Sequence, residues 1–313
     1  FKNLAGREFH HRSQLRPRVF NIGLSYSLRL LATLNNEESM LKQIVAVIAF
    51  TAFFVGPAIA QLPDTVFLDE LTWTEVRDSI NNGTTTVIVA TAGTEQNGPH
   101  MVLGKHKFIV SYAAEQIARR LGNTLVAPVI AYVPEGNLDP PSGHMRYSGA
   151  ITLPQEHFMT LLEFTARSLA VHGFTDIVFI GDSGGNTRGM QAVTEALTSQ
   201  WDGAPARVYH IPEYYTEDMY SCEYLKAELG IFQQPDECRA TRNEYHDDYH
   251  YSSIIATVDP NMIRTNQRIE ADLFSINGVD LEPVEATIAN GRKLVEYRAQ
   301  ITARAIRAAI QGQ

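Results

Sequence analysis

The body of the chain has no run of Lys and Arg, and this absence excludes one class of partner. Lys and Arg number 26 against 35 Asp and Glu, and the formal net charge is −9. A protein that binds DNA or RNA carries a basic face, so we expect no nucleic-acid partner. The chain also lacks internal repeats, low-complexity stretches and linkers rich in Pro or Ser, which favours a single domain over residues 61–313.

The chain also has little that could anchor it in a membrane. The apolar run from Ile44 to Val55 is shorter than the roughly 20 residues that a spanning helix needs. A weakly basic stretch beginning at Met40 precedes it, and the small-residue tripeptide Ala58-Ile59-Ala60 follows it. This is the layout of a cleaved signal peptide over residues 40–60. We therefore expect a periplasmic or secreted protein without a stable membrane anchor, and we interpret residues 1–39 as a non-native upstream extension.

Cysteine is scarce, and its use fits export. Cys222 and Cys238 are the only two cysteines in the sequence, and an oxidising compartment would pair them. The bridge would close a loop in a polar, Tyr-rich segment that has little core of its own. Two buried free thiols are the alternative, because the spacing of cysteines does not by itself establish a disulfide.

Strand-like and helix-like patterns alternate along residues 61–313. The predicted strands cover residues 85–92, 124–133, 176–180 and 207–211, and the predicted helices cover 72–80, 107–121, 154–172, 187–201 and 284–310. Strands that are separated by helices favour a mostly parallel sheet with helices on both faces. The predicted fold class is therefore α/β.

The segment from Gly93 to His106 places polar side chains just past the first predicted strand. Glu95, His100 and His106 lie within twelve residues of one another. Ligands of open α/β sheets bind beyond the carboxyl ends of the strands, and carboxylates and imidazoles are common metal ligands. This segment therefore predicts the first part of a metal site.

A second segment, Gly181-Asp182-Ser183-Gly184-Gly185-Asn186, lies between a predicted strand and a predicted helix. Its glycines would let the backbone approach a ligand, and the helix N-terminus favours an anion or an acceptor. Gly-Asp-Ser-Gly-Gly also resembles the nucleophile motif of chymotrypsin-like serine proteases. That fold is built from antiparallel barrels and needs a His and an Asp upstream in set contexts, so the strand–helix alternation argues against it.

Two further segments carry histidine. His144 lies in the Gly-rich loop from Pro141 to Gly149, which could shape a substrate pocket or be a plain connection. The segment from His246 to Ser253 offers two His and two Asp within five residues, including His250. These groups suit a metal ligand or a proton shuttle, although a solvated acidic loop is the alternative.

Taken together, these four segments resemble the creatininase (creatinine amidohydrolase) family from about Leu71 to Ile310. The family's Glu-Gln-His-Gly-Pro-His-Leu-Pro-Leu-Gly-Thr-Asp stretch stands here as Glu95 to His106, and its Asn-Gly-His-Gly-Gly-Asn turn as Gly181 to Asn186. Its Phe-Pro-Gly-Thr loop matches the residues near His144 to Gly149, and its His-Ala-Gly-Glu segment matches His246 to Ser253. The resemblance implies a three-layer α/β/α fold, a homo-oligomer such as a hexamer, a divalent-metal site, and hydrolysis of a C–N amide bond in a small or cyclic substrate.

The chain departs from the family pattern at several ligand positions. Asn97 and Ser183 replace metal-binding histidines, His106 replaces a bridging aspartate, Tyr249 replaces a glutamate, and Asp182 replaces a glycine. An imidazole presents one free nitrogen to a metal and does not bridge two ions as a carboxylate can. Glu95, His106 and Asp182 still offer three ligands, which is the number that a catalytic metal site uses.

We therefore expect a mononuclear Zn²⁺ or Mn²⁺ site held by Glu95, His106 and Asp182, with a small-molecule substrate. The resemblance places His246 as the group that carries a proton to the leaving nitrogen, with His250 as an alternative, and His100 as a fourth ligand or its orienting partner. Candidate substrate-binding residues are His144, Asn97, Ser183 and Tyr249. A metal-free binding protein of the same fold and an ester or lactone hydrolase are the alternatives.

Overall fold

A computed structural model describes residues 63–216, 218–233, 248–272, 275–276 and 278–312, without the side chains of residues 216–222 and 276. These described residues belong to one compact unit. The predictions for residues 1–60, for His246 and for the Cys222–Cys238 bridge lie outside the described residues. Within the described part of the chain, no helix is both long and apolar enough to cross a membrane.

Four parallel strands form the central sheet in the order β2-β1-β3-β4. They are β1 (Thr86–Thr91), β2 (Thr124–Val126), β3 (Asp176–Gly181) and β4 (Arg207–His210). Every residue of β1 is buried, which fits a central strand of a sheet that is covered on both faces. The α/β fold class predicted from the sequence is confirmed.

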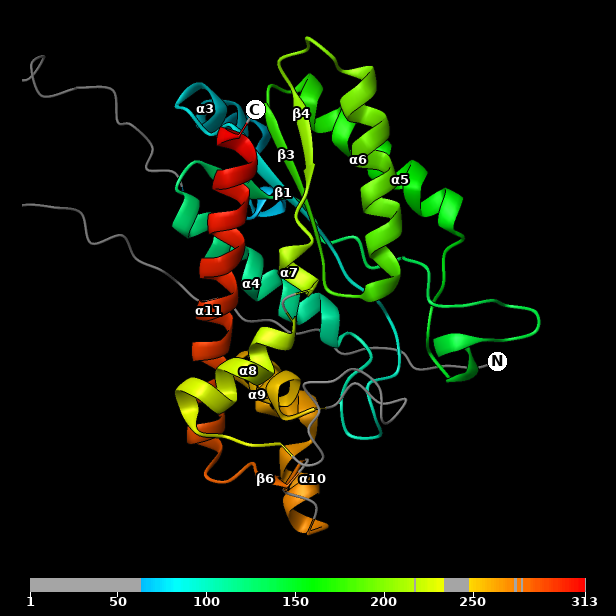
Figure 1. Cartoon of the computed structure of the whole chain (residues 1–313), viewed down its shortest axis with the longest axis vertical. Helices are drawn as coiled ribbons and strands as arrows, with labels where there is room; N and C mark the ends of the chain where they lie inside the picture. The colour runs from blue at the N-terminus through cyan, green and yellow to red at the C-terminus, as the bar shows by residue number, and fades with distance from the viewer. Residues whose placement is uncertain (1–62, 217, 234–247, 273–274, 277, 313) are drawn as a thin grey trace, which may run out of the picture. The chain divides into compact units, whose positions relative to one another are not determined.

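Helices cover both faces of this sheet (Figure 1). On one face lie α4 (Lys105–Leu121) and α11 (Val284–Gln311), and on the other lie α5 (Gln155–Val171) and α6 (Thr187–Gln200). Alternate residues of β1 pack against the two helical layers, because successive side chains of a strand point to opposite faces of the sheet. Ile88 and Ala90 belong to the apolar core under α4 and α11, whereas Val87 and Val89 belong to the core under α5 and α6.

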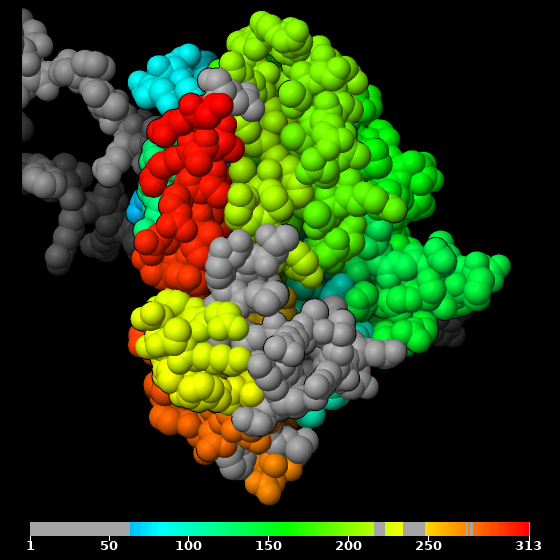
Figure 2. Space-filling view, in the orientation of Figure 1, coloured from blue at the N-terminus to red at the C-terminus, as the bar shows by residue number. Residues whose placement is uncertain are grey.

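A group of short elements lies past the carboxyl ends of the strands (Figure 1), and its first three helices pack against α11. Its members are α7 (Glu213–Thr216), α8 (Asp218–Leu229), α9 (Tyr249–Val258), η5 (Pro260–Ile263), α10 (Thr265–Glu270) and the antiparallel pair β5 (Ser275–Ile276) and β6 (Val279–Asp280). Figure 2 shows α8 in yellow next to the red surface of α11. The remaining elements are η2 (Leu68–Glu70), α3 (Trp73–Asn81), η3 (Gly143–Arg146) and η4 (Gly184–Asn186).

Local sequence signals explain where several helices begin and end. Thr72 caps α3 in a reciprocal capping box with Glu75, in which each side chain accepts from the other residue's backbone N–H. At its C-terminus α4 stops at Gly122, whose φ of 87° lies in the left-handed region that favours glycine.

The predicted strand over residues 124–133 was too long. The regular ladder of β2 ends at Val126, and the pairing with β1 then continues only through the isolated bridge between Thr91 and Ile130. Pro128 has no N–H to donate to a ladder, so the chain leaves the regular strand there. The irregular segment that follows leads to Glu135 and to the loop that carries η3.

Candidate functional site

The carboxyl ends of β1 and β3 are tied together, and this brings two acidic residues close to each other. The two strands pair in register up to Thr91 and Gly181, and the backbone N–H of Asp182 donates to the carbonyl of Thr91 at 3.0 Å. Asn186, in the turn after β3, donates from Nδ2 to Thr91 Oγ1 and to the carbonyl of Ala92, each at 2.9 Å. Asp182 therefore lies beside the loop after β1 that carries Glu95.

His106, in the first turn of α4, lies between these two carboxylates. Its Nε2 is 2.7 Å from Glu95 Oε1, and its Nδ1 is 2.8 Å from Asp182 Oδ2. The three side chains are almost completely buried. Burial and the charge of Lys105 lower the pKa of His106, but the charge of Glu95 and the hydrogen bonds to Asp182 and Glu95 outweigh them, so the pKa is raised. Each ring nitrogen thus faces a carboxylate oxygen, an arrangement that favours the protonated ring.

The second oxygen of Asp182 has its own two donors. Tyr214 Oη and Arg298 Nη1 each donate to Asp182 Oδ1 at 3.0 Å, and Arg298 belongs to α11. The guanidinium also lies over the Tyr214 ring, 5.2 Å from its centroid. Burial, and then the charge of Asp182, raise the pKa of Tyr214 well above its usual value, so its hydroxyl keeps the proton that it donates.

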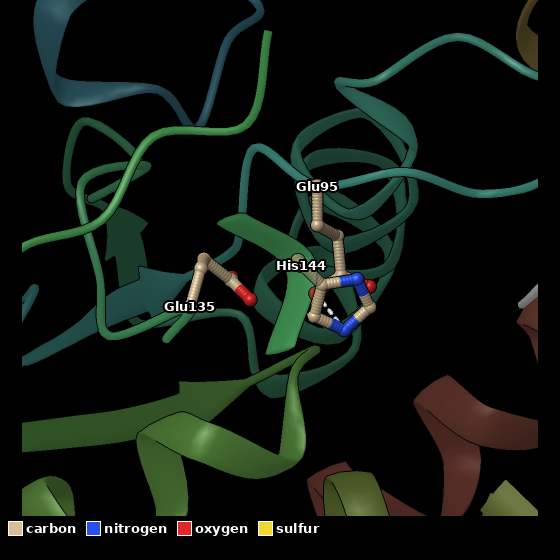
Figure 3. A group of neighbouring side chains, drawn as sticks. All are labelled: Glu95, Glu135 and His144. Atoms are coloured by element: carbon tan, nitrogen blue, oxygen red, sulfur yellow. Dashed lines mark ion pairs between the residues drawn. The ribbon is translucent and has the colours of Figure 1, made fainter. Parts of the chain in front are cut away.

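The second oxygen of Glu95 faces a different pair of side chains. His144 Nε2 lies 3.3 Å from Glu95 Oε2, and the carboxyl group of Glu135 points towards them (Figure 3). Glu95, Glu135 and His144 each offer one donor atom, and the three atoms lie within 4.8 Å of one another. Glu95 and Glu135 are buried, whereas His144 is half-buried. This group has the ligand types and the proximity to hold one cation.

Glycines allow the backbone to bring these side chains together. A Cβ at Gly93 would lie 2.2 Å from Glu135 Oε1, and a Cβ at Gly136 would lie 2.1 Å from the carbonyl oxygen of Ser142. Gly136 and Gly143 also have positive φ, at 136° and 56°. The two backbone segments approach so closely that the N–H of His144 donates to the carbonyl of Glu135 at 3.0 Å.

Glu135 is an acidic side chain whose ionised form is disfavoured. Burial first, and then the hydrogen bond to Glu95 and the charge of Glu95, raise the pKa of Glu135 to about 10, against the opposing charge of Lys105. Among the described residues, Glu135 Oε1 has no hydrogen-bond partner. A proton or a cation must therefore accompany the two facing carboxyl groups.

Lys105 contributes a buried positive charge next to this group. Its side chain is fully buried, and its ammonium nitrogen lies over the Tyr251 ring, 3.9 Å from the centroid. Its charge acts on both His106 and Glu135. The site therefore combines three acidic side chains with the cationic groups of Lys105, His106 and Arg298.

A family profile described as "Creatinine amidohydrolase" matches residues 69–306, which include every element of the sheet and both helical layers. The chain belongs to the creatininase family. The resemblance identified in the sequence is confirmed.

One curated protein and several solved structures are similar to this chain. The mycofactocin precursor peptide peptidase of Mycobacterium tuberculosis is 30% identical over 120 residues, which cover 36% of this chain and 44% of the relative. The chain thus matches less than half the length of that curated relative. Among solved structures, a Trp-to-Ala mutant creatininase has a TM-score of 0.58 at 18% identity, covering 78% of this chain and 98% of the other.

Two other solved creatininases carry metals in their titles. One is titled "Creatininase Mn", with a TM-score of 0.57 at 18% identity. The other is a Glu-to-Gln mutant of "Zn-Zn type", with a TM-score of 0.55 at 19% identity. In each case 78% of this chain and 98% of the other are covered. At these identities the likeness shows the fold alone.

The three residues that the sequence predicts as ligands of a single metal ion do not converge on one point. Glu95, His106 and Asp182 do meet, but His106 directs one ring nitrogen at each carboxylate. The two nitrogens of an imidazole point away from each other, so the three residues do not surround a common point. Among the described residues, the donors that converge are those of Glu95, Glu135 and His144, and His144 had been assigned to substrate binding.

The other predicted site residues lie in several environments. Asn97 is buried, and its Nδ2 donates to the carbonyls of Glu95 and Val102, so it braces the loop after β1. Ser183 is buried beside Asp182 and precedes η4. His100 is half-buried in the same loop as Glu95 and is not a member of the converging group.

Tyr249 and His250 lie in the first turn of α9, and both are buried. The Tyr249 hydroxyl accepts from Asn290 Nδ2 at 3.1 Å and lies 3.4 Å from Thr287 Oγ1, so this side chain packs between α9 and α11. The ring of His250 lies tilted against the ring of Tyr251, with 4.1 Å between the ring centroids.

Sequence reasoning missed four residues of this site: Glu135, Lys105, Tyr214 and Arg298. Glu135 had a usable signal, because it follows a predicted strand at the same edge of the sheet as Glu95 and Asp182. Arg298 had none, because it contacts Asp182 from 116 positions away along the chain.

Proposed function

We propose that this creatininase-family chain is a metal-dependent hydrolase that cleaves a C–N amide bond in a small or cyclic substrate. The observation that carries this proposal is the convergence of Glu95, Glu135 and His144 within 4.8 Å. The Mn and Zn-Zn titles of its structural neighbours support Zn²⁺ or Mn²⁺ as the cation. The family match supports an amide as the bond.

The residues fit a divalent cation for an electrostatic reason. Two carboxyl groups face each other in a buried place. Burial first, and then the hydrogen bond and charge of Glu95, raise the pKa of Glu135 to about 10, so its ionised form needs more countercharge than Lys105 supplies. A divalent cation would supply that countercharge and allow both groups to ionise. Two carboxylate oxygens and one imidazole nitrogen also leave open the further positions that a catalytic metal needs.

A bound divalent cation would supply Lewis acidity and would lower the pKa of a bound water to about 7. The protein's own side chains would set the direction from which the substrate approaches and would supply a positive charge beside it. His144 is the partly exposed member of the group, with 22% of its side chain accessible against 2% for Glu95, so the substrate would approach past His144. Lys105 provides a fixed positive charge in a water-poor environment, where such charges best stabilise a developing anion.

The decisive experiment measures metal and activity together. We expect about one Zn or Mn ion per purified chain by elemental analysis, and hydrolysis of creatinine or another cyclic amide that a chelator abolishes. Glu135→Gln and His144→Gln should lose the ion, whereas Glu156→Gln and His157→Gln, at exposed positions of α5, should keep it. Esters and lactones are assayed in parallel, because the same water would attack either carbonyl.

A metal-free binding protein is the second candidate, and one observation favours it. Lys105, Arg298 and the His106 imidazolium already neutralise much of the negative charge, and a single proton shared by Glu135 and Glu95 would neutralise the rest. This candidate predicts no bound ion after gentle purification, and no effect of chelator on stability or on ligand binding. That result would contradict the hydrolase proposal.

Export is a separate proposal that rests on the sequence of residues 40–60. We propose that this segment is removed after Ala60 and that the product is periplasmic or secreted. N-terminal sequencing of the protein recovered from the periplasm or medium should begin at Gln61. Recovery from the cytoplasm with residues 40–60 intact would contradict the proposal.

Assembly is also a proposal. We propose that the chain forms a homo-oligomer, because the family resemblance implies one, such as a hexamer. Light scattering after size-exclusion chromatography should give a multiple of the chain mass, and a monomer at micromolar concentration would contradict it.

A further inference from the structure

A continuous chain of buried polar contacts runs from α11 to the proposed metal site. Arg298 and Tyr214 donate to Asp182 Oδ1, His106 Nδ1 contacts Asp182 Oδ2, and His106 Nε2 contacts Glu95 Oε1. The distances are 3.0, 3.0, 2.8 and 2.7 Å in that order. We call these five residues the Arg298–Glu95 chain.

We propose that Arg298 and Tyr214 are positioning residues for the metal ligand Glu95, acting through Asp182 and His106. This inference rests on the proposed function, because Arg298 and Tyr214 can position a metal ligand only if Glu95 binds a cation. It concerns no direct contact between Arg298 and substrate or metal.

The argument begins with the way Asp182 divides its two oxygens. Oδ1 receives both Tyr214 and Arg298, which leaves Oδ2 for His106. The plane of the carboxylate is therefore fixed from the side of α7 and α11. The contact between Asp182 Oδ2 and Nδ1 sets the orientation of the His106 ring. The orientation of the ring then sets the direction in which Nε2 points.

The second step passes this orientation on to Glu95. Because Nε2 contacts Oε1 at 2.7 Å, the other oxygen, Oε2, is the one directed at His144 and Glu135. Rotation of the Glu95 carboxyl group would break its contact with His106. In a buried site an unmet polar group costs about 1–3 kcal/mol, so the orientation is strongly held.

The side chains of the Arg298–Glu95 chain are buried, and this strengthens the coupling between Arg298 and the orientation of Glu95. The side chains of Arg298, Asp182, His106 and Glu95 are 6%, 2%, 3% and 2% accessible. Water is therefore poorly placed to replace a lost partner. Partners that orient metal ligands in this way are typically worth 10- to 100-fold in metal affinity.

The test is the affinity of the purified full chain for Mn²⁺, measured by isothermal titration calorimetry. Tyr214→Phe deletes one hydroxyl that donates to Asp182 and leaves the ring in place. We expect it to weaken Mn²⁺ binding about tenfold. Arg298→Met should weaken it by at least as much, and Arg298→Lys should restore part of the loss because an ammonium can still donate to Asp182.

A matched control lies at the other end of β3. Tyr209 Oη donates to Asp176 Oδ1 at 3.2 Å, and Asp176 begins the strand that Asp182 follows. Tyr209→Phe therefore makes the same chemical change to a Tyr–Asp contact away from the metal site, and Mn²⁺ affinity should be unchanged. The electron paramagnetic resonance line shape of bound Mn²⁺ should change in Tyr214→Phe and not in Tyr209→Phe.

The outcomes separate this inference from the proposed function. If the unmodified chain binds no Mn²⁺ and no Zn²⁺, the metal proposal and this inference both fail. If it binds Mn²⁺ and Tyr214→Phe binds it equally well, the inference alone is overturned. Should Arg298→Met fail to fold, the comparison of Tyr214→Phe with Tyr209→Phe still decides.

Discussion

At the scale of single residues, Gly93 determines where the carboxyl group of Glu135 can lie. A Cβ at position 93 would stand 2.2 Å from Glu135 Oε1, far inside van der Waals contact. The φ of Gly93 is not positive, so an alanine would not strain the backbone. The only serious conflict of Gly93→Ala is thus with the proposed metal ligand.

We therefore expect Gly93→Ala to displace Glu135 and to weaken Mn²⁺ or Zn²⁺ binding tenfold or more. In a Glu135→Ala background the same change should have no further effect, because the conflicting oxygen is gone. Calorimetric titration of the four proteins completes a double-mutant cycle. Additive losses would show that Gly93 acts by another route.

Asp182 is a second residue whose substitution should have a large effect, in this case on the free energy of unfolding. It is the shared partner of Arg298 and His106, both buried. Asp182→Asn keeps the shape and removes the charge, which takes one buried countercharge away from Arg298 and from His106, although His106 still contacts Glu95. We expect a loss of roughly 3–5 kcal/mol in the free energy of unfolding, measured by urea denaturation. The half-buried Asp176→Asn serves as the control and should cost about 1 kcal/mol.

The residue scale also shows how far the sequence predicts the site. Glu95 and Asp182 could be expected to lie together, because both follow buried parallel strands. The sequence could not predict that His106 directs one ring nitrogen at each of these carboxylates, because the orientation of a ring cannot be deduced from the spacing of residues. Glu135 was within reach of the same strand-end argument, whereas Arg298 meets Asp182 only through tertiary folding.

At the scale of elements, the packing of α9 against α11 depends on one glycine. A Cβ at Gly291 would lie 1.9 Å from the carbonyl oxygen of Ser253 and 2.4 Å from its carbonyl carbon. Alanine is favoured over glycine within a helix by about 1 kcal/mol. Here the clash is with backbone rather than with a flexible side chain, so the two helices must separate.

We expect Gly291→Ala to destabilise the protein by about 1–3 kcal/mol net, despite its better helix propensity. Thermal and urea unfolding measure this change. The control is Ala289→Gly at an exposed position of the same helix, where propensity alone acts and costs about 1 kcal/mol. Stabilisation by Gly291→Ala would mean that α9 and α11 do not approach so closely.

The four strands of the sheet and the helices α3, α4, α5, α6 and α11 were predictable, because each depends on its own residues. Helix α3 has its capping box, and α4, α5, α6 and α11 have apolar faces that recur at helical spacing. The exceptions depend on partners that are distant in sequence or on single disruptive residues. Pro128 shortens β2, and the two-residue strands β5 and β6 are too short to show an alternating pattern.

At the scale of the whole described unit, the site is where the separate layers meet. Glu95 and Asp182 come from the ends of β1 and β3, His106 from α4, and Arg298 from α11. Glu135 and His144 come from the loops between β2 and α5. A cation at Glu95, Glu135 and His144 would directly hold the loop after β1 and the segment between β2 and α5, and would be linked to β3, α4 and α11 through Glu95, His106 and Asp182.

Metal binding should for this reason stabilise the entire unit against unfolding. A ligand present at 100 times its Kd adds about 2.7 kcal/mol when it binds only the folded state, which corresponds to roughly 5–10 °C in Tm for a unit of this size. We expect Mn²⁺ or Zn²⁺ to raise the Tm of the unmodified chain and EDTA to reverse the increase. In Glu135→Gln the metal should have no effect, because the ion has lost a ligand. Equal shifts in both proteins would place the stabilising ion elsewhere on the surface and would remove the thermodynamic support for a site at Glu95, Glu135 and His144.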